Sequence, residues 1–191
     1  MNKALAQLCL DAYIDGRETW RSEGDTEVLL RTINQVHCLA FRGTEFNFGG
    51  LKDIWSDLRV SPWYDERTGW CRKGFLRAAQ GIWPQISEFV MRPAVPICLT
   101  GHSLGGAVAC IVARLMIHYG KLPVRLTTFG CPKPGWDDLI ERLSEIEPQD
   151  HFVNRGDPVP HLPCSGAYPR PRRSLAGDKH RLSEYKVFVP D

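Results

Sequence analysis

The sequence predicts an α/β fold with a mostly parallel central sheet and flanking helices. From residue 74 onward, short apolar runs alternate with longer segments of helical periodicity, and strands joined by helices pair in parallel through right-handed crossovers. The chain has 191 residues, 43% hydrophobic and 24% charged, which is typical of one globular domain with a sizeable core. We therefore expect residues 1–191 to form a single, compact domain.

The first part of the chain predicts a helix and a hairpin. Apolar residues recur at helical spacing over residues 2–13. The runs EVLLRTI (27–33) and VHCLAF (36–41) are separated by two residues, which is typical of two antiparallel strands. Residues 45–70 are rich in aromatic residues and glycine, and we expect an irregular segment with a short helix around Leu51–Leu58.

Helices and strands alternate in the rest of the chain. Residues 74–91 have the pattern of a helix that Pro84 kinks or restarts. The next elements are expected to be strand 95–101, helix 104–120, strand 124–130, helix 135–146 and strand 151–155. A Pro- and Arg-rich loop over 156–179 and a last strand at 184–190 complete the prediction.

The composition excludes several classes of protein. The chain carries 24 Lys and Arg against 22 Asp and Glu, so it lacks the basic excess of a nucleic-acid-binding domain. No apolar run reaches the ~18 residues of a membrane-spanning helix. Cys and His do not occur at the short spacings of a zinc site, and we expect neither a metal nor an organic cofactor. Nothing in the sequence indicates an oligomer, so a monomer is the default expectation.

The cysteines and the N-terminus predict a cytoplasmic protein. There are seven Cys, an odd number without a C-x-x-C motif, and several lie in apolar runs. Residues 1–16 lack the basic start and long apolar stretch of a signal peptide. We therefore expect reduced thiols and residence in the cytoplasm, with release by a route that needs no signal peptide as an alternative.

The strongest functional signal is the motif Gly101-His102-Ser103-Leu104-Gly105. It lies between an expected buried strand and an apolar helix, the context in which a G-x-S-x-G turn presents a nucleophilic serine above a sheet. Side chains in place of Gly101 or Gly105 would collide with neighbouring elements. The alternative is a small-residue turn in which Ser103 only caps the helix.

A serine nucleophile needs a base and a carboxylate that orients this base. Asp157 directly follows the strand 151–155, at the carboxyl edge of the sheet where open α/β folds carry their sites. Two histidines follow it. His180 is preferred as the base because it can fold back over this edge, whereas His161 shares the loop of Asp157 and remains the alternative.

Several segments occur in the order found in one enzyme family. They are VHCLAFRGT (36–44), KGFL (73–76), TGHSLGG (100–106), FGCPKPG (129–135), VNRGDPVPHLP (153–163) and His180 with Tyr185. In these segments the chain resembles the class 3, or fungal-type, lipases. The resemblance covers most of residues 25–187. It departs from the family at Cys71-Arg72, where members often have Val-His.

The resemblance implies the α/β-hydrolase fold in a compact version and hydrolysis of carboxylic esters, typically of glycerolipids. It implies Ser103 as nucleophile, Asp157 as orienting carboxylate and His180 as base. It further implies an oxyanion hole formed by Thr44 and the backbone N–H of Leu104, which lies at a helix N-terminus.

The segment after Thr44 predicts a lid over the acyl site. In the family, a mobile lid occupies this position, which corresponds here to residues 45–58, and Gly49-Gly50 would be its hinge. The apolar set of the candidate lid is Phe46, Phe48, Leu51, Ile54 and Trp55. A surface helix that packs its apolar stripe on the core is an equally good interpretation.

A basic cluster near His180 suggests contact with anionic lipid head groups, although charge runs are often only solvated loops. The cluster consists of Arg170, Arg172, Arg173, Lys179 and Arg181. The sequence as a whole predicts a serine hydrolase of lipid esters that makes transient contact with a lipid interface. The alternatives are a phospholipase A-type enzyme, a thioesterase or acyltransferase, and a non-catalytic binding module on the same fold.

Overall fold

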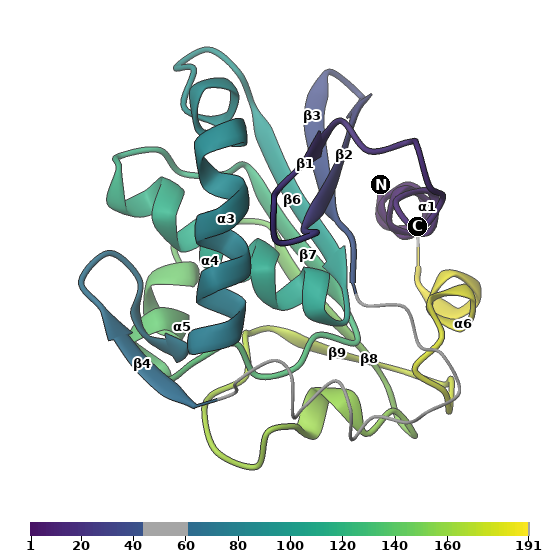
Figure 1. Cartoon of the computed structure of the whole chain (residues 1–191). Helices are drawn as coiled ribbons and strands as arrows, with labels where there is room; N and C mark the ends of the chain where they lie inside the picture. The colour runs from purple at the N-terminus through teal and green to yellow at the C-terminus, as the bar shows by residue number, and fades with distance from the viewer. Residues whose placement is uncertain (44–60, 191) are drawn as a thin grey trace.

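A seven-stranded sheet with helices on both faces is the frame of the molecule (Figure 1). The computed structural model describes residues 1–43 and 61–190. In the order in which they lie side by side, the strands are β1 (Trp20–Arg21), β2 (Glu27–Ile33), β3 (Val36–Phe41), β6 (Ile97–His102), β7 (Arg125–Phe129), β8 (Gln149–Asn154) and β9 (Arg172–Leu175). The pairs β1–β2 and β2–β3 are antiparallel, and each pair from β3 to β9 is parallel. The predicted hairpin and the mostly parallel sheet are thus confirmed.

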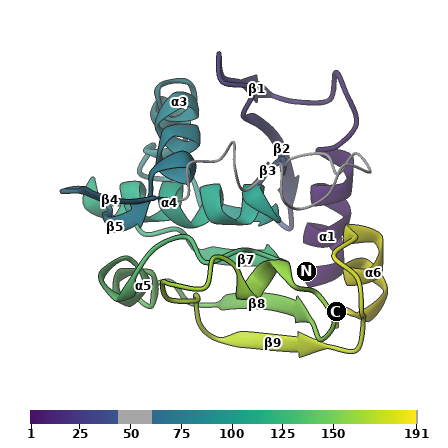
Figure 2. The ribbon, with the colours of Figure 1, turned by 60° about the horizontal axis from the view of Figure 1, so that its bottom comes forward.

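The helices bury two separate apolar layers against the sheet. α3 (Lys73–Val90), α4 (Leu104–His118) and α5 (Asp137–Leu143) cover one face. α1 (Asn2–Asp11) and α6 (Leu182–Phe188) lie together on the other face of the sheet. Figure 2 shows these two helices beside β7, β8 and β9. Every residue of β6 is buried, because a parallel strand covered on both faces has no solvent side.

The expected last strand over 184–190 is wrong, because this segment forms the helix α6. Leu182, Tyr185 and Val189 follow one another at helical spacing, and each is at most 5% exposed. They pack in the layer of α1, so the helix buries them on one face. The β-branched residues near the C-terminus favour a strand locally, and tertiary packing overrides that preference.

Three strand regions of the structure are not predicted from the sequence. β9 lies within the expected loop, and three of its four residues are exposed, so no apolar run announces it. β4 (Pro62–Asp65) and β5 (Gly69–Arg72) form a separate hairpin in the stretch expected to be irregular. β1 has only two residues. α3 continues through Pro84 as one helix, and the short helix expected around Leu51–Leu58 lies outside the described residues.

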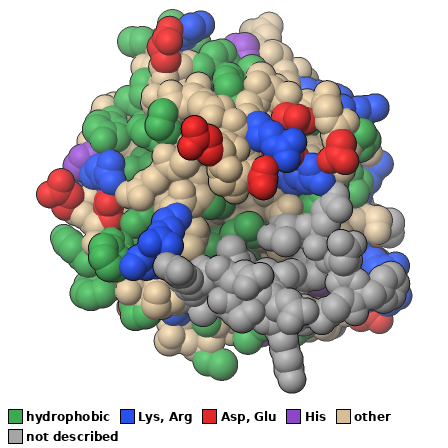
Figure 3. Space-filling view, viewed as in Figure 1, with side chains coloured by type: hydrophobic (Ala, Val, Ile, Leu, Met, Phe, Trp, Pro, Cys, Tyr) green, Lys and Arg blue, Asp and Glu red, His purple; other side chains and the backbone are tan. Residues whose placement is uncertain are grey.

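The surface mixes both signs of charge. Figure 3 shows basic and acidic side chains interspersed on one face, and ion pairs join such side chains, among them Arg31 with Asp11 at 3.0 Å and Arg42 with Asp15 at 2.9 Å. Among residues 1–43 and 61–190, no helix has the length and apolar character that crossing a bilayer requires.

Candidate active site

The turn between β6 and α4 holds Ser103 in a strained conformation. Its φ of 54° and ψ of −127° are rare for a residue with a side chain. A Cβ on Gly101 would overlap the backbone of Gly105, and a Cβ on Gly105 would overlap the carbonyl of Phe41. The two glycines therefore let strand, turn and helix pack closely enough to form the tight turn that the motif predicts.

The structure brings Asp157 and His180 into direct contact. Asp157 follows β8 and is fully buried, and its Oδ2 lies 2.6 Å from Nδ1 of His180. Its Oδ1 accepts a hydrogen bond from the N–H of Val159 at 2.8 Å. Because a carboxylate only accepts, Nδ1 of His180 donates, and Nε2 is left as the basic nitrogen.

Ser103 lies at the same edge of the sheet. It is the covalent neighbour of His102, whose ring centroid lies 4.7 Å from that of His180. The carboxyl ends of β6 and β8 therefore bring the three predicted residues to one edge of the sheet. Ser103 itself is 6% exposed, and its N–H donates to the carbonyl of Phe129 at 3.0 Å.

Gly130, which is not among the site residues predicted from the sequence, makes room for the Asp157–His180 pair. A Cβ at this position would lie 2.9 Å from Oδ2 of Asp157 and 3.0 Å from two atoms of the His180 ring. Gly130 also has a φ of +58°, which disfavours other residues. Its position directly after β7, at the carboxyl edge, was the available signal.

Tyr185 is a second residue without a predicted role. It is fully buried in α6, its hydroxyl donates to Oδ2 of Asp157, and it accepts the N–H of Asn154 at 3.1 Å. Burial, together with the neighbouring Asp157 carboxylate, raises the pKa of the Tyr185 phenol, so it remains a donor. The hydrogen bond between Tyr185 and Asp157 depends on α6, a segment that the sequence predicts to be a strand.

Two other histidines that follow the serine turn in the sequence have different partners. His161 is exposed, and its Nε2 lies 3.3 Å from a guanidinium nitrogen of Arg172. His151 is fully buried between Thr128 and Gln149, each at 2.7 Å, and burial lowers the pKa of its imidazole to about 3. The geometry therefore joins His180, and not His161, to the carboxylate.

Part of the predicted site falls outside the described residues. Leu104 is the first residue of α4, so its N–H lies in the first turn of that helix. Thr44 and the candidate lid, with Phe46, Phe48, Leu51, Ile54 and Trp55, belong to residues 44–60, which the structure does not describe. The preceding Gly43 lies against the serine turn: a Cβ there would be 3.4 Å from Cβ of Ser103.

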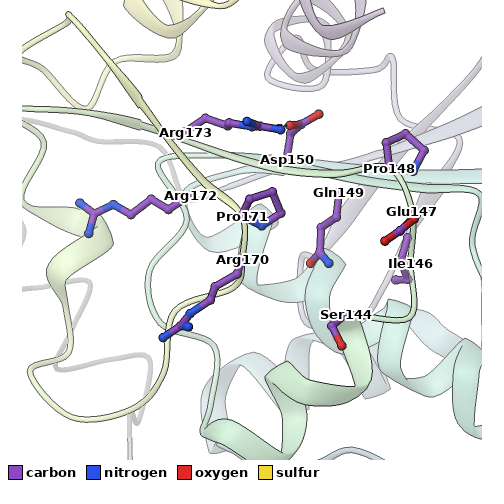
Figure 4. A pocket seen from close by; sticks show the side chains of 10 residues that line it. All are labelled: Ser144, Ile146, Glu147, Pro148, Gln149, Asp150, Arg170, Pro171, Arg172 and Arg173. Carbon is purple, nitrogen blue, oxygen red and sulfur yellow. Dashed lines mark hydrogen bonds and ion pairs between the residues drawn. The ribbon is translucent and has the colours of Figure 1, made fainter.

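The basic cluster, which lies near His180 in the sequence, is divided between the two edges of the sheet. Arg170, Arg172 and Arg173 line a hollow of about 970 Å³ at the start of β8 and β9 (Figure 4). That edge is about 17 Å from the carboxyl edge, the length of β8. Arg173 forms an ion pair with Asp150 at 2.8 Å, whereas the side chains of Arg170 and Arg172 extend away from this pair.

Comparison with protein families shows to which family the chain belongs. The family model described as lipase (class 3) matches residues 38–166. The chain belongs to the class 3 lipase family. This class 3 lipase chain also resembles the structure of the Rhizomucor miehei lipase propeptide complex, with a TM-score of 0.69 and 21% identity, over 93% of this chain and 67% of that one. The predicted family and the compact α/β-hydrolase fold are thus confirmed.

The curated relatives include two lipases that are named as secreted. A secreted mono- and diacylglycerol lipase 2 of Gibberella zeae is 36% identical over 109 residues, which are 48% of this chain and 27% of that protein. A secreted mono- and diacylglycerol lipase 1 of Fusarium solani is 35% identical over 96 residues, which are 47% of this chain and 28% of that protein. The chain thus matches less than a third of the length of these relatives. The family and these relatives support the prediction of a carboxylic-ester hydrolase.

The expectation of a cytoplasmic protein is contradicted by these relatives, because both are named as secreted. Reduced cysteines do not require a reducing compartment in this fold. Six of the seven cysteines are free and buried, and a thiol packed in a core is shielded from oxidants in any compartment.

Proposed function

We propose that this class 3 lipase chain hydrolyses carboxylic esters of lipids through Ser103, His180 and Asp157. The observation that carries the proposal is the 2.6 Å contact between Asp157 and His180 beside the strained Ser103 turn. Because the buried carboxylate accepts a hydrogen bond from Nδ1, Nε2 of His180 is the nitrogen that can take the proton of the serine hydroxyl. Serine hydrolases need this arrangement.

The reaction proceeds in two acyl transfers. His180 takes the hydroxyl proton of Ser103 while the serine oxygen attacks the ester carbonyl, and the C=O π electrons move to the oxygen. When the tetrahedral intermediate collapses, His180 gives the proton to the leaving alcohol and an acyl-enzyme remains. A water, deprotonated by His180, then attacks the acyl group, and Ser103 leaves with its proton restored.

The oxyanion accepts hydrogen bonds from the N–H of Leu104 and from Thr44. Leu104 supports this role because it opens α4, where backbone N–H groups have no partner inside the helix. Loss of one such donor typically lowers the rate by about 10²–10³. The role of Thr44 as a donor is inferred from the family resemblance alone.

A panel of p-nitrophenyl esters of increasing chain length, acylglycerols, phospholipids and thioesters tests the function. We expect hydrolysis of lipid esters by the wild type and none by Ser103→Ala. A fluorophosphonate probe should label the wild type and spare that variant. Preference for phospholipids would favour a phospholipase A-type enzyme, preference for thioesters would favour a thioesterase, and absence of labelling would favour a binding module. We further infer, from the secreted relatives, that the protein acts outside the cell.

A further inference from the structure

The histidine of the serine turn takes no part in the proposed mechanism, yet the side chain of His102 is buried and both ring nitrogens are bonded. We propose that His102 is a positioning residue that holds the main chain of His180, and that the Tyr13 hydroxyl supports the ring by a hydrogen bond to its other nitrogen. The proposal rests on the proposed function, because His180 is the base there.

The two hydrogen bonds define the tautomer of His102. Its Nε2 lies 2.8 Å from the carbonyl oxygen of His180. A carbonyl only accepts, so Nε2 carries the hydrogen. Nδ1 is then the acceptor, and the hydroxyl of Tyr13 donates to it at 2.9 Å. In the opposite tautomer, the Tyr13 hydroxyl would have to accept a hydrogen bond from Nδ1, and the His180 carbonyl would lose its donor, so this carbonyl decides the tautomer.

The environment keeps His102 neutral. Burial, and secondarily the neighbouring His180, lower the pKa of His102 well below 6.5. Among residues 1–43 and 61–190, the ionisable groups that face its ring include Tyr13, His180 and Tyr185. The ring centroids of His102 and Tyr185 are 6.0 Å apart, and Arg42 lies 5.8 Å from the Tyr13 ring. A neutral imidazole beside His180 does not repel the imidazolium that forms there when the base takes its proton.

The segment that carries His180 depends on such tertiary bonds. It lies between β9 and α6 and forms no ladder or helix of its own. The amide of Asn154 donates to the carbonyl of Lys179 at 2.8 Å, and His102 donates to the carbonyl of the next residue. Asp157 fixes the ring, while Asn154 and His102 fix the main chain. Removal of one anchor should let the ring move, and a shift of about 1 Å can cost on the order of 10²-fold in rate.

The location of His102 also ties the base to the nucleophile. His102 ends β6 and is followed directly by Ser103. One side chain therefore joins the strand that presents the nucleophile to the loop that presents the base. Tyr13 lies just beyond α1, so its hydrogen bond to His102 also joins the N-terminal part of the chain to this pair of elements.

Three variants of the full chain test the proposal. His102→Leu removes both bonds, and His102→Gln keeps an amide that donates and an oxygen that accepts. Tyr13→Phe removes only the hydroxyl that is bonded to Nδ1 of His102. His151→Leu is the matched control, because His151 is also fully buried and bonded at both nitrogens but lies away from Asp157.

Kinetics are measured on a monomeric p-nitrophenyl butyrate solution at a temperature where every variant is folded. For His102→Leu we expect kcat to fall on the order of 100-fold while KM stays within about twofold. His102→Gln should recover most of this loss, and Tyr13→Phe should lose about fivefold to tenfold. The control should retain wild-type kcat.

Hydrogen exchange of the amides of residues 177–181 tests the anchoring without catalysis. We expect exchange at least about tenfold faster in His102→Leu than in the wild type, His102→Gln or the control. Unchanged exchange in His102→Leu, equal kcat in the Leu and Gln variants, or an equal loss in the control would overturn the proposal. If Ser103 is not labelled by a fluorophosphonate in the wild type, the proposed function fails, and the exchange experiment still decides whether His102 is an anchor.

Discussion

Tyr185→Phe should destabilise the fold far more than its single lost oxygen suggests. The hydroxyl is fully buried, donates to the Asp157 carboxylate and accepts the N–H of Asn154. A hydrogen bond to a charged group contributes about 1.5–3 kcal/mol, and an orphaned buried N–H costs about 1–3 kcal/mol. These terms overlap, so we expect a loss of about 2–4 kcal/mol, which lowers Tm by roughly 6–12 °C for a chain of this size.

A second tyrosine provides the matched control. Tyr168 also has a buried hydroxyl, but this hydroxyl makes no hydrogen bond with any residue that the structure describes. Tyr168→Phe removes the same atom from a similar setting and should leave the stability unchanged or raise it slightly. Urea unfolding of both variants, followed by tryptophan fluorescence, gives the two free energies.

The outcome for activity separates stability from chemistry. Asp157 keeps His180 and the Val159 N–H as partners in Tyr185→Phe, so kcat on a soluble ester should fall less than about tenfold. Equal unfolding free energies for Tyr185→Phe and Tyr168→Phe would refute the reasoning, because the hydrogen bonds of Tyr185 would then contribute nothing.

Three further predictions follow from the site and its surroundings. Asp157→Asn should keep the fold and lower kcat about 10⁴-fold, because an amide no longer selects the Nδ1–H tautomer of His180; a loss below about tenfold would contradict the assigned role. Gly105→Ala should lower Tm strongly, because its Cβ overlaps the Phe41 carbonyl, as a thermal scan would reveal. Burial lowers the pKa of His151 to about 3 in the folded state, below its unfolded value near 6.5. Protonation of His151 in the unfolded chain therefore lowers the free energy of unfolding as the pH falls from about 6.5 to about 3. His151→Gln should reduce the slope of the unfolding free energy there by about 1.4 kcal/mol per pH unit, and an unchanged slope would contradict neutral burial.

The serine turn and the order of the central elements could be predicted from local sequence. The tight serine turn requires glycine at positions 101 and 105, because a Cβ at either would overlap neighbouring backbone. The apolar run before the turn is typical of a buried parallel strand, and all residues of β6 are buried. The position of Asp157 followed from the same logic, since the end of a strand determines the edge at which the next residue lies. By contrast, β9 has three exposed residues and was missed because its neighbours, and not its composition, make it a strand.

The sequence by itself determined the class of fold, the family resemblance and the residues proposed for the reaction, because these depend on short segments whose steric demands are local. Only the tertiary structure decided which histidine meets Asp157, that Gly130 and Tyr185 complete its surroundings, and that three of the arginines lie at the opposite edge. It also turned the expected last strand into α6. Each of these depends on contacts between residues far apart in the chain, and burial against α1 or β8 outweighs the local preference of the segment.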